Sequence, residues 1–217
     1  FASEKVRQLG LSGRQRLTAN MAPPDPTPLP PADFAARDLP IEIIDKGARL
    51  VRIHRTELSP IFFGSSGGNR FDDPTRQYGV SYLSQTIEGA FAETCLRSIG
   101  ARFVALSFLE ARSFCEIEVT SPLRLVSVHG PGLARIGATG IVTSGPHSVA
   151  QEWSRAIHDH SAGADGVVYR SNHDNGELCV ALFERAHDRL AVIASTPILS
   201  SRDRLGELFA RYKVGLG

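Results

Sequence analysis

Short apolar runs and one alternating segment predict a series of β-strands. Residues 48–54, ARLVRIH, alternate between apolar and polar positions, as a half-buried strand does. The other predicted strands are apolar runs at residues 80–83, 103–109, 114–119, 166–169, 178–183 and 190–195. Residues 59–78 contain glycines and prolines but few periodic apolar positions, so a long loop is expected between the first two strands.

Apolar positions at helical spacing predict the helices. Residues 86–99 carry an apolar stripe, and Gly100 follows where such a helix would end. Further helices are predicted at residues 131–136, 147–159 and 202–212. Asp33 is expected to cap a short helical turn that runs through Ala36. Helices and strands together indicate one α+β domain with about six or seven strands.

The proline-rich segment at residues 22–31, APPDPTPLPP, precedes the predicted domain. So many prolines exclude a helix or a central strand, and we expect an extended arm that tethers the domain or docks on a partner. Residues 1–20 are predicted to be a short basic helix or an unstructured lead-in, and Met21, the single methionine, could be a start of translation. We therefore divide the chain into an N-terminal extension, residues 1–40, and a folded domain, residues 41–217.

Composition excludes several classes of protein. The chain has 217 residues, of which 42% are hydrophobic and 22% charged, so it can bury a core and is not expected to be disordered. A net charge of +1 gives no overall attraction to nucleic acid or an anionic membrane, and no apolar run reaches the ~20 residues of a membrane helix. Cys95, Cys115 and Cys179 lack CxxC spacing, so reduced thiols, no metal site and a cytoplasmic location are predicted.

Several common catalytic motifs are absent from the sequence. It contains no P-loop, no strand-linked GxGxxG and no HExxH, so P-loop, Rossmann-type and zinc-protease sites have no support. His158 and His160 lie two residues apart near a predicted helix end and would not share a helical face. We therefore predict solvated histidines there in preference to metal ligands.

One stretch combines side chains that fit an anionic ligand. Arg52 interrupts an apolar strand, where a long cation must be paired or point into a cleft. The loop at residues 64–71, GSSGGNRF, lets the backbone approach a ligand closely, and Arg70 could bind a diphosphate. Tyr82 and Glu93 follow on the next predicted strand and helix. Each has an ordinary structural alternative: a surface ion pair for Arg52, the core for Tyr82, and the wet face of the helix for Glu93.

This stretch resembles the front half of the RES domain. The similarity is carried by RIHR (52–55), GGNRFD (67–72), YGVSYLSQTIEGAFAET (78–94), GADGVVYRSN (163–172) and GELCVALFE (176–184). It runs from about residue 50 to residue 183, which is most of the predicted domain. RES domains resemble ADP-ribosyltransferases in fold, which implies a single domain with a mixed, mostly antiparallel sheet and flanking helices.

The resemblance also assigns candidate site residues. The family arginine falls on Arg52, the second arginine on Arg70, the tyrosine on Tyr82 and the glutamate on Glu93. Gly68 is the loop glycine expected to approach the substrate.

The family serine has two equal candidates. Ser171 matches the end of the Y-x-S strand, and Ser148, ahead of an A-Q pair, matches a second polar position. The sequence departs from the family at Phe71, where tryptophan is frequent, and at Arg170, where proline is usual. Both departures are expected to border the cleft.

The resemblance implies a bacterial toxin that consumes NAD+. The expected reaction is cleavage of the nicotinamide–ribose bond, by hydrolysis or phosphorolysis, which depletes NAD+. Glu93 would stabilise the positive charge that develops on the ribose, Arg52 and Arg70 would bind the diphosphate, and Tyr82 would stack on the nicotinamide. The alternatives are a protein ADP-ribosyltransferase, which needs the same residues, and a non-catalytic nucleotide-binding partner.

The resemblance further implies what the chain binds. NAD+ is a substrate, and no prosthetic group or metal is expected. The expected protein partner is an Xre-like helix-turn-helix antitoxin that covers the cleft and forms a hetero-oligomer with the toxin. Direct contact with nucleic acid or a membrane is not expected.

Overall fold

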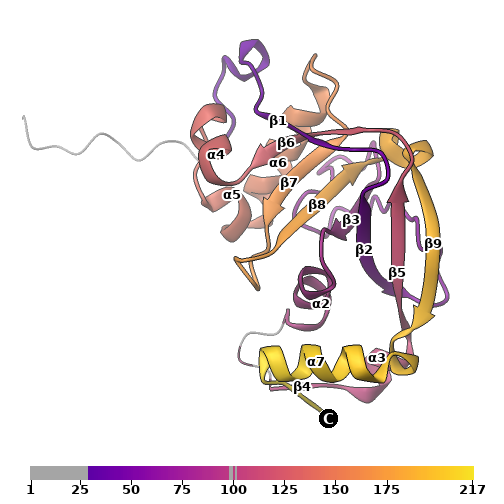
Figure 1. The fold of residues 1–217 in the computed structure, drawn as a ribbon. Coiled ribbons are helices and arrows are strands. Elements are labelled where there is room, and N and C mark those ends of the chain that lie inside the picture. Colours follow the sequence, from indigo (N-terminus) through magenta and orange to yellow (C-terminus); the bar gives the residue numbers. More distant parts are fainter. Residues whose placement is uncertain (1–28, 98–99, 101) are drawn as a thin grey trace, which may run out of the picture.

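The computed structural model describes residues 29–97, 100 and 102–217 (Figure 1). The predicted lead-in at residues 1–20, Met21 and residues 22–28 of the proline-rich arm lie outside the described residues. The helical turn predicted near Ala36 is present as the short 3-10 helix η2 (Phe34–Ala36), although the Asp33 side chain makes no cap hydrogen bond.

A large mixed sheet forms the centre of the molecule. The strands are β1 (Ile41–Ile44), β2 (Arg49–Arg55), β3 (Val80–Ser84), β4 (Phe103–Val104), β5 (Arg112–Val119), β6 (Leu123–Val128), β7 (Gly166–Arg170), β8 (Leu178–Phe183), β9 (Leu190–Pro197) and β10 (Gly215–Leu216). Within the described chain, eight strands join in the order β1-β6-β7-β8-β3-β2-β5-β9, and β4 pairs with β10 in a second sheet. Neighbours in the large sheet are antiparallel except for β6 and β7. The predicted α+β fold with a mixed, mostly antiparallel sheet is confirmed.

Helices flank this sheet in two groups (Figure 1). They are α2 (Ile87–Cys95), α3 (Leu106–Glu110), α4 (Gly130–Ile136), α5 (Ile141–Ser144), α6 (His147–Asp159) and α7 (Arg202–Tyr212), with the short 3-10 helices η3 (Glu184–Arg189) and η4 (Ile198–Ser200). In Figure 1, α4, α5 and α6 lie together beside β6 and β7, whereas α2, α3 and α7 lie towards the opposite end of the molecule.

Most predicted elements are confirmed, and the differences have local causes. The helix predicted at residues 86–99 ends at Cys95, and residues 98 and 99 lie outside the described residues. The strand predicted at residues 103–109 is wrong beyond Val104, because α3 covers most of the remainder. A short apolar run fits a helix or a strand equally well, so the pattern alone could not decide.

Two strands of the large sheet were not predicted. β6 is buried at every position except Arg124, but its Arg and Ser residues interrupt the apolar run. β1 is short and lies at the edge of the sheet, where its Ile43 is 49% exposed. Edge strands bury less apolar surface, and their sequence pattern is correspondingly weaker.

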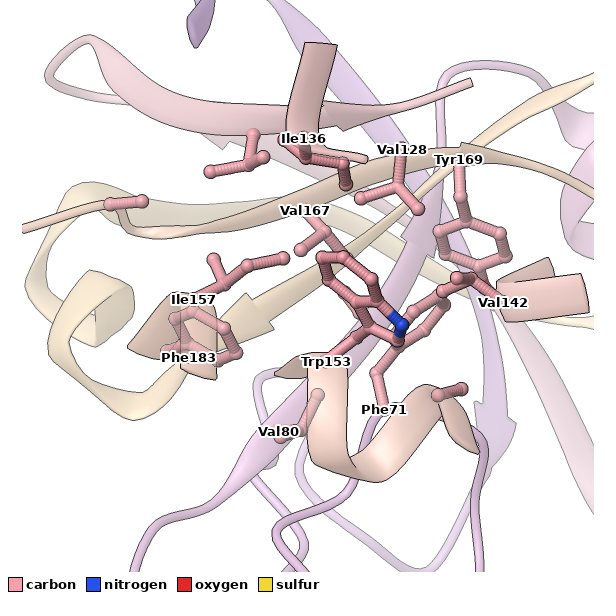
Figure 2. Packing of buried hydrophobic residues seen from close by; sticks show 14 of the residues in the cluster. Phe71, Val80, Val128, Ile136, Val142, Trp153, Ile157, Val167, Tyr169 and Phe183 are labelled. Carbon is pink, nitrogen blue, oxygen red and sulfur yellow. The ribbon is translucent and has the colours of Figure 1, made fainter. Parts of the chain in front are cut away.

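The largest core cluster fills the space between α4–α6 and one face of the sheet. Figure 2 shows Trp153 of α6 among side chains from the sheet and from Phe71. The Trp153 ring meets Phe34 edge-on, with centroids 5.4 Å apart. Phe71, the last residue of the glycine-rich loop at residues 64–71, is fully buried here. The end of this loop is therefore anchored in the core.

Two further clusters complete the interior. One packs on the opposite face of the sheet, around Leu83, Val168 and Val180. The other joins α2 and α7 to β2 and β5 through side chains such as Phe91 and Leu208. Helix α2 is thus held against the sheet at the point where β2 and β3 meet.

Candidate active site

A cleft of about 330 Å³ opens where β2 and β3 separate. β2 pairs with β3 only at Val51 and Ser84, whereas β3 pairs with β8 along its whole length. Beyond that single pair the two strands diverge, and residues from both line the cleft. Further lining residues come from α2, β7, β8 and the glycine-rich loop, so the topology brings distant parts of the sequence to one place.

Glu93 reaches the cleft from helix α2. The helix approaches β3 closely because Gly89 has no side chain; a Cβ there would lie 2.2 Å from Ser84 Oγ. Oε1 of Glu93 is buried and has no hydrogen-bond partner among the described residues. Leaving a buried polar atom unpaired costs about 1–3 kcal/mol, so this oxygen is suited to a ligand that supplies a hydroxyl or positive charge.

Arg52 occupies the cleft from strand β2. Its Nη1 donates to the carbonyl oxygens of Pro60 and Phe62, both at 3.0 Å, and to Ser81 Oγ at 2.9 Å. None of the ion pairs found in the described chain includes Arg52. Burial lowers the pKa of Arg52, yet an arginine remains charged at neutral pH. The cleft therefore holds a cation that no carboxylate neutralises directly.

Tyr82 contributes its ring to the cleft while its hydroxyl group is engaged elsewhere. The hydroxyl donates to Asp72 Oδ1 at 2.9 Å and accepts from the Phe71 amide at 2.9 Å. Burial and the neighbouring Asp72 carboxylate raise the pKa of Tyr82 well above its usual value. Tyr82 is therefore a neutral ring suited to stacking and is a poor proton donor or acceptor for a substrate.

The glycine-rich loop is held by helix α6. Gln151 Nε2 donates to the carbonyl oxygens of Gly67 at 2.9 Å and Asn69 at 3.0 Å. These contacts fix the loop by its carbonyl groups and bring Asn69 to the cleft wall. The sequence did not single out Asn69, although it lies within the motif that carries the resemblance.

Arg70 lies beside the cleft and is not among the residues that line it. Its Nη1 donates to the carbonyl oxygen of Gly145 at 2.7 Å. Burial lowers the pKa of Arg70, and the negative charge of Glu93 opposes that shift. Arg70 thus contributes positive potential near Glu93 from outside the cleft wall.

The remaining predicted residues also lie outside the cleft wall. Gly68 is exposed, and its carbonyl oxygen lies 3.2 Å from His147 Nδ1. Ser148 is exposed on the first turn of α6. Ser171 is buried, and its Oγ accepts hydrogen bonds from the amides of His173 and Asp174, both at 3.1 Å.

The structure adds lining residues that the sequence did not single out. Tyr169 of β7 is buried, and its ring centroid lies 4.8 Å from that of Phe71. Arg55, Arg97 and Arg112 line the cleft as well. Their places in the sequence are far apart and give no common signal, so only the fold could bring them together.

The histidine prediction is wrong for one residue. His160 is only 9% exposed, and its Nδ1 accepts a hydrogen bond from the Ala162 amide at 3.0 Å. His158 stacks on Tyr78 with ring centroids 3.7 Å apart. Among the described residues no cluster of three or more His, Cys, Asp or Glu side chains could hold a metal ion.

The cysteines are all free thiols. Cys115 and Cys179 are buried and Cys95 is half-buried. Across the described part of the chain, no helix is long and apolar enough to cross a membrane.

Both the sequence and the fold match known proteins. The sequence model of the RES domain matches residues 49–202. A relative described as probable toxin y4kH, from Sinorhizobium fredii (strain NBRC 101917 / NGR234), is 32% identical over 117 residues, which cover 54% of this chain and 91% of the relative. The crystal structure of the M. tuberculosis MbcT–MbcA toxin–antitoxin complex contains a chain of similar fold, with a TM-score of 0.57 and 18% identity over 74% of this chain and 90% of that one.

Proposed function

The chain belongs to the RES domain family, and we propose that it is the toxin of a toxin–antitoxin pair that cleaves the nicotinamide–ribose bond of NAD+. The observation that carries this proposal is the buried, unpartnered Glu93 Oε1 in a cleft that also contains the unneutralised cation Arg52. A ligand that is positive near Glu93 and negative near the arginines suits this arrangement. NAD+ has both features, a nicotinamide riboside cation and a diphosphate.

Bond cleavage places positive charge on the ribose in an oxocarbenium-like transition state. A carboxylate oxygen already shielded from water stabilises that charge more strongly than a hydrated one, because less water must reorganise. Nicotinamide leaves as a neutral molecule, so the reaction requires no strong acid. We assign the stabilising role to Glu93, whose free Oε1 can also accept a hydrogen bond from a ribose hydroxyl.

The other cleft residues are assigned to binding. Arg52 can interact with the diphosphate through the guanidinium nitrogens that do not contact Pro60, Phe62 and Ser81. The Tyr82 ring can stack on the nicotinamide, since its hydroxyl is occupied by Asp72.

Four further residues are assigned supporting roles by the family resemblance. Arg70 and Gly68 would meet the dinucleotide from the glycine-rich loop. Either Ser148 or Ser171 would complete the site with a hydroxyl group. Ser171 retains its hydroxyl hydrogen for donation while accepting two amide hydrogen bonds.

Nicotinamide release tests the reaction directly. The purified protein is incubated with NAD+, and free nicotinamide is followed by chromatography. Glu93→Gln preserves the size of the side chain and removes its charge, so we expect turnover to fall by about 100-fold or more. Glu88→Gln is the matched control, because Glu88 lies on the same helix and does not line the cleft. Absence of nicotinamide release from the wild type, with or without a cell lysate, would contradict the proposal.

The fate of the ADP-ribose is tested with adenylate-labelled NAD+ and lysate. Free labelled product supports hydrolysis or phosphorolysis, whereas label on a protein band supports transfer to a protein.

The proteins that this chain resembles, a probable toxin and a chain of a toxin–antitoxin complex, support an antitoxin as the partner. We propose an Xre-like antitoxin, and purification of the tagged chain with the product of the adjacent reading frame tests this.

A further inference from the structure

Three arginines that the proposed reaction has not used gather at the cleft. Arg55, Arg97 and Arg112 all line it. Arg55 and Arg112 are directly opposite in the pairing of β2 with β5, so their side chains leave the sheet on the same side with Cβ atoms about 5 Å apart. Arg97 follows α2, and its Nε donates to the Glu93 carbonyl oxygen at 2.6 Å. The three positive charges therefore line the same cleft as Glu93, and Arg97 lies one helical turn from it.

The positive charges of this arginine group are poorly compensated. Like charges directly opposite on neighbouring strands destabilise a sheet. Among the described residues, the group makes one ion pair, Arg55 with Glu57 at 3.8 Å, and both side chains are mostly exposed. An exposed pair of that kind contributes little, because water screens it. Burial lowers the pKa of Arg112, and the charges of Arg55 and Arg97 lower it further.

Arg112 is held in position without being neutralised. Its guanidinium carbon lies 3.3 Å from the Phe108 ring centroid, and its Nη1 donates to the Phe108 carbonyl oxygen at 2.7 Å. A cation that is fixed on an aromatic ring and a carbonyl group can still present its other nitrogens to an anion. Arginine suits phosphate in particular, since its planar fork can bind two oxygens at once.

The arginine group marks the outer end of the cleft. Glu93 Oε1 is buried and Arg52 and Arg112 are half-buried, whereas the Arg55 side chain is 63% exposed and Arg97 is exposed. A dinucleotide with its nicotinamide ribose at Glu93 must therefore lead outward past these arginines. We propose that Arg55, Arg97 and Arg112 form a phosphate subsite at the cleft mouth, which together with Arg52 receives the diphosphate of the dinucleotide. This inference rests on the proposed NAD+ cleavage.

The charge distribution of the chain supports this assignment. Of the described residues that line the cleft, four are arginines and one is an acid, Glu93. The whole chain carries a net charge of only +1, so the excess is specific to this place. Glu93 lies at the buried end and three of the arginines lie toward the mouth. This order of charges matches NAD+, in which a positive nicotinamide riboside is followed by a negative diphosphate.

Steady-state kinetics of nicotinamide release test the subsite. For the double variant Arg97→Gln/Arg112→Gln, and to a smaller extent for Arg55→Gln, we expect KM for NAD+ to rise about tenfold while kcat changes by less than about twofold. Arg49→Gln is the matched control for Arg55→Gln, because both residues are on β2 and 63% exposed, but Arg49 pairs with Glu116 and lies outside the cleft. Nicotinamide mononucleotide has the scissile bond without the diphosphate, so its KM should change much less. An unchanged KM for NAD+ in the double variant would overturn the subsite.

Binding of ADP-ribose separates this inference from the reaction itself. ADP-ribose contains the diphosphate but not the scissile bond, and calorimetry measures its binding whether or not NAD+ is cleaved. We expect the wild type to bind it and the double variant to bind it about tenfold more weakly, with thermal unfolding confirming that the variant is folded. Equal binding by the two proteins, or none by the wild type, would overturn the subsite. Inorganic phosphate that bound the wild type as tightly as ADP-ribose would show a free-anion site and overturn it too.

Discussion

Tyr82 donates a hydrogen bond of 2.9 Å to Oδ1 of the fully buried Asp72, and this contact joins the cleft to the glycine-rich loop. The other carboxylate oxygen of Asp72 accepts from Ser66 Oγ at 3.0 Å, from the Asn69 amide at 3.0 Å and from Asn69 Nδ2 at 3.1 Å. Tyr82 and Asn69 both line the cleft. One carboxylate therefore positions two parts of the cleft wall, and we regard Asp72 as a positioning residue.

Replacement of Asp72 by Asn is expected to loosen the cleft wall. Asparagine has the same size, but one of its two terminal groups is a donor, so at least one of the present donors loses its acceptor. We expect the free energy of unfolding to fall by about 1–3 kcal/mol and KM for NAD+ to rise about tenfold, with a smaller change in kcat. Urea unfolding and nicotinamide release measure the two effects separately.

Asp73→Asn is the matched control for that variant. Asp73 is also buried and accepts hydrogen bonds from Thr75 and Gln77, but it does not line the cleft. We expect Asp73→Asn to lose stability and to keep the KM of the wild type. If both variants raised KM equally, the positioning role of Asp72 would be wrong and general destabilisation would explain the result.

Long helices with a regular apolar pattern were predicted well from the sequence. The helices at residues 147–159 and 202–212 have the predicted bounds, because their apolar periodicity extends over several turns. The apolar run at residues 103–109 was misjudged, since it is too short for its period to distinguish α3 from a strand. Local pattern also could not reveal that β2 and β3 share a single residue pair, although that separation creates the cleft.

The candidate site was predictable only where its residues lie in the motif at residues 52–94 that resembles the RES domain. Arg52, Tyr82 and Glu93 lie within the motif and meet at the cleft. Arg112 is brought there by its pairing with Arg55 across two strands, which is a property of the fold. The sequence predicted an anionic ligand from Arg52 and Arg70, whereas most of the positive charge at the cleft comes from elsewhere.

Asp73 should make stability depend on pH in the acid range. Burial alone would raise the pKa of Asp73, but hydrogen bonds from Gln77 and Thr75 outweigh it and lower the pKa. A group whose pKa is lowered by folding stabilises the protein above its unfolded pKa, about 3.9, and loses that contribution as pH falls through the lower folded value. We expect the wild type to be about 2 kcal/mol more stable than Asp73→Asn at pH 7, and this difference to shrink below about pH 4. Urea unfolding of both proteins between pH 3 and pH 7 measures it, and a difference independent of pH would contradict the assignment.

Cys115 and Cys179 should be unreactive in the folded protein. Burial raises the pKa of Cys115 to about 11 and that of Cys179 to about 12. Alkylation requires the thiolate, which is scarce at pH 8 for such thiols, and both side chains are shielded from solvent. Mass spectrometry after iodoacetamide treatment should show no label at either position in the native protein and full labelling in urea. Rapid native labelling of Cys179, which lines the cleft, would indicate a more open cleft than the structure shows.

Thr86 links the helix that carries Glu93 to the rest of the fold. Its Oγ1 accepts from the Gly89 amide at 3.1 Å, which caps α2, and donates to Glu177 Oε2 at 2.5 Å. Thr86→Ala removes both bonds, so we expect stability to fall by about 1–2 kcal/mol and Tm by about 2–8 °C. Thr86→Ser retains the hydroxyl group and should recover most of the loss. Thermal unfolding of the three proteins decides this. If Thr86→Ala melted with the wild type, the cap would not stabilise α2, and packing of the helix against the sheet would hold Glu93 in place.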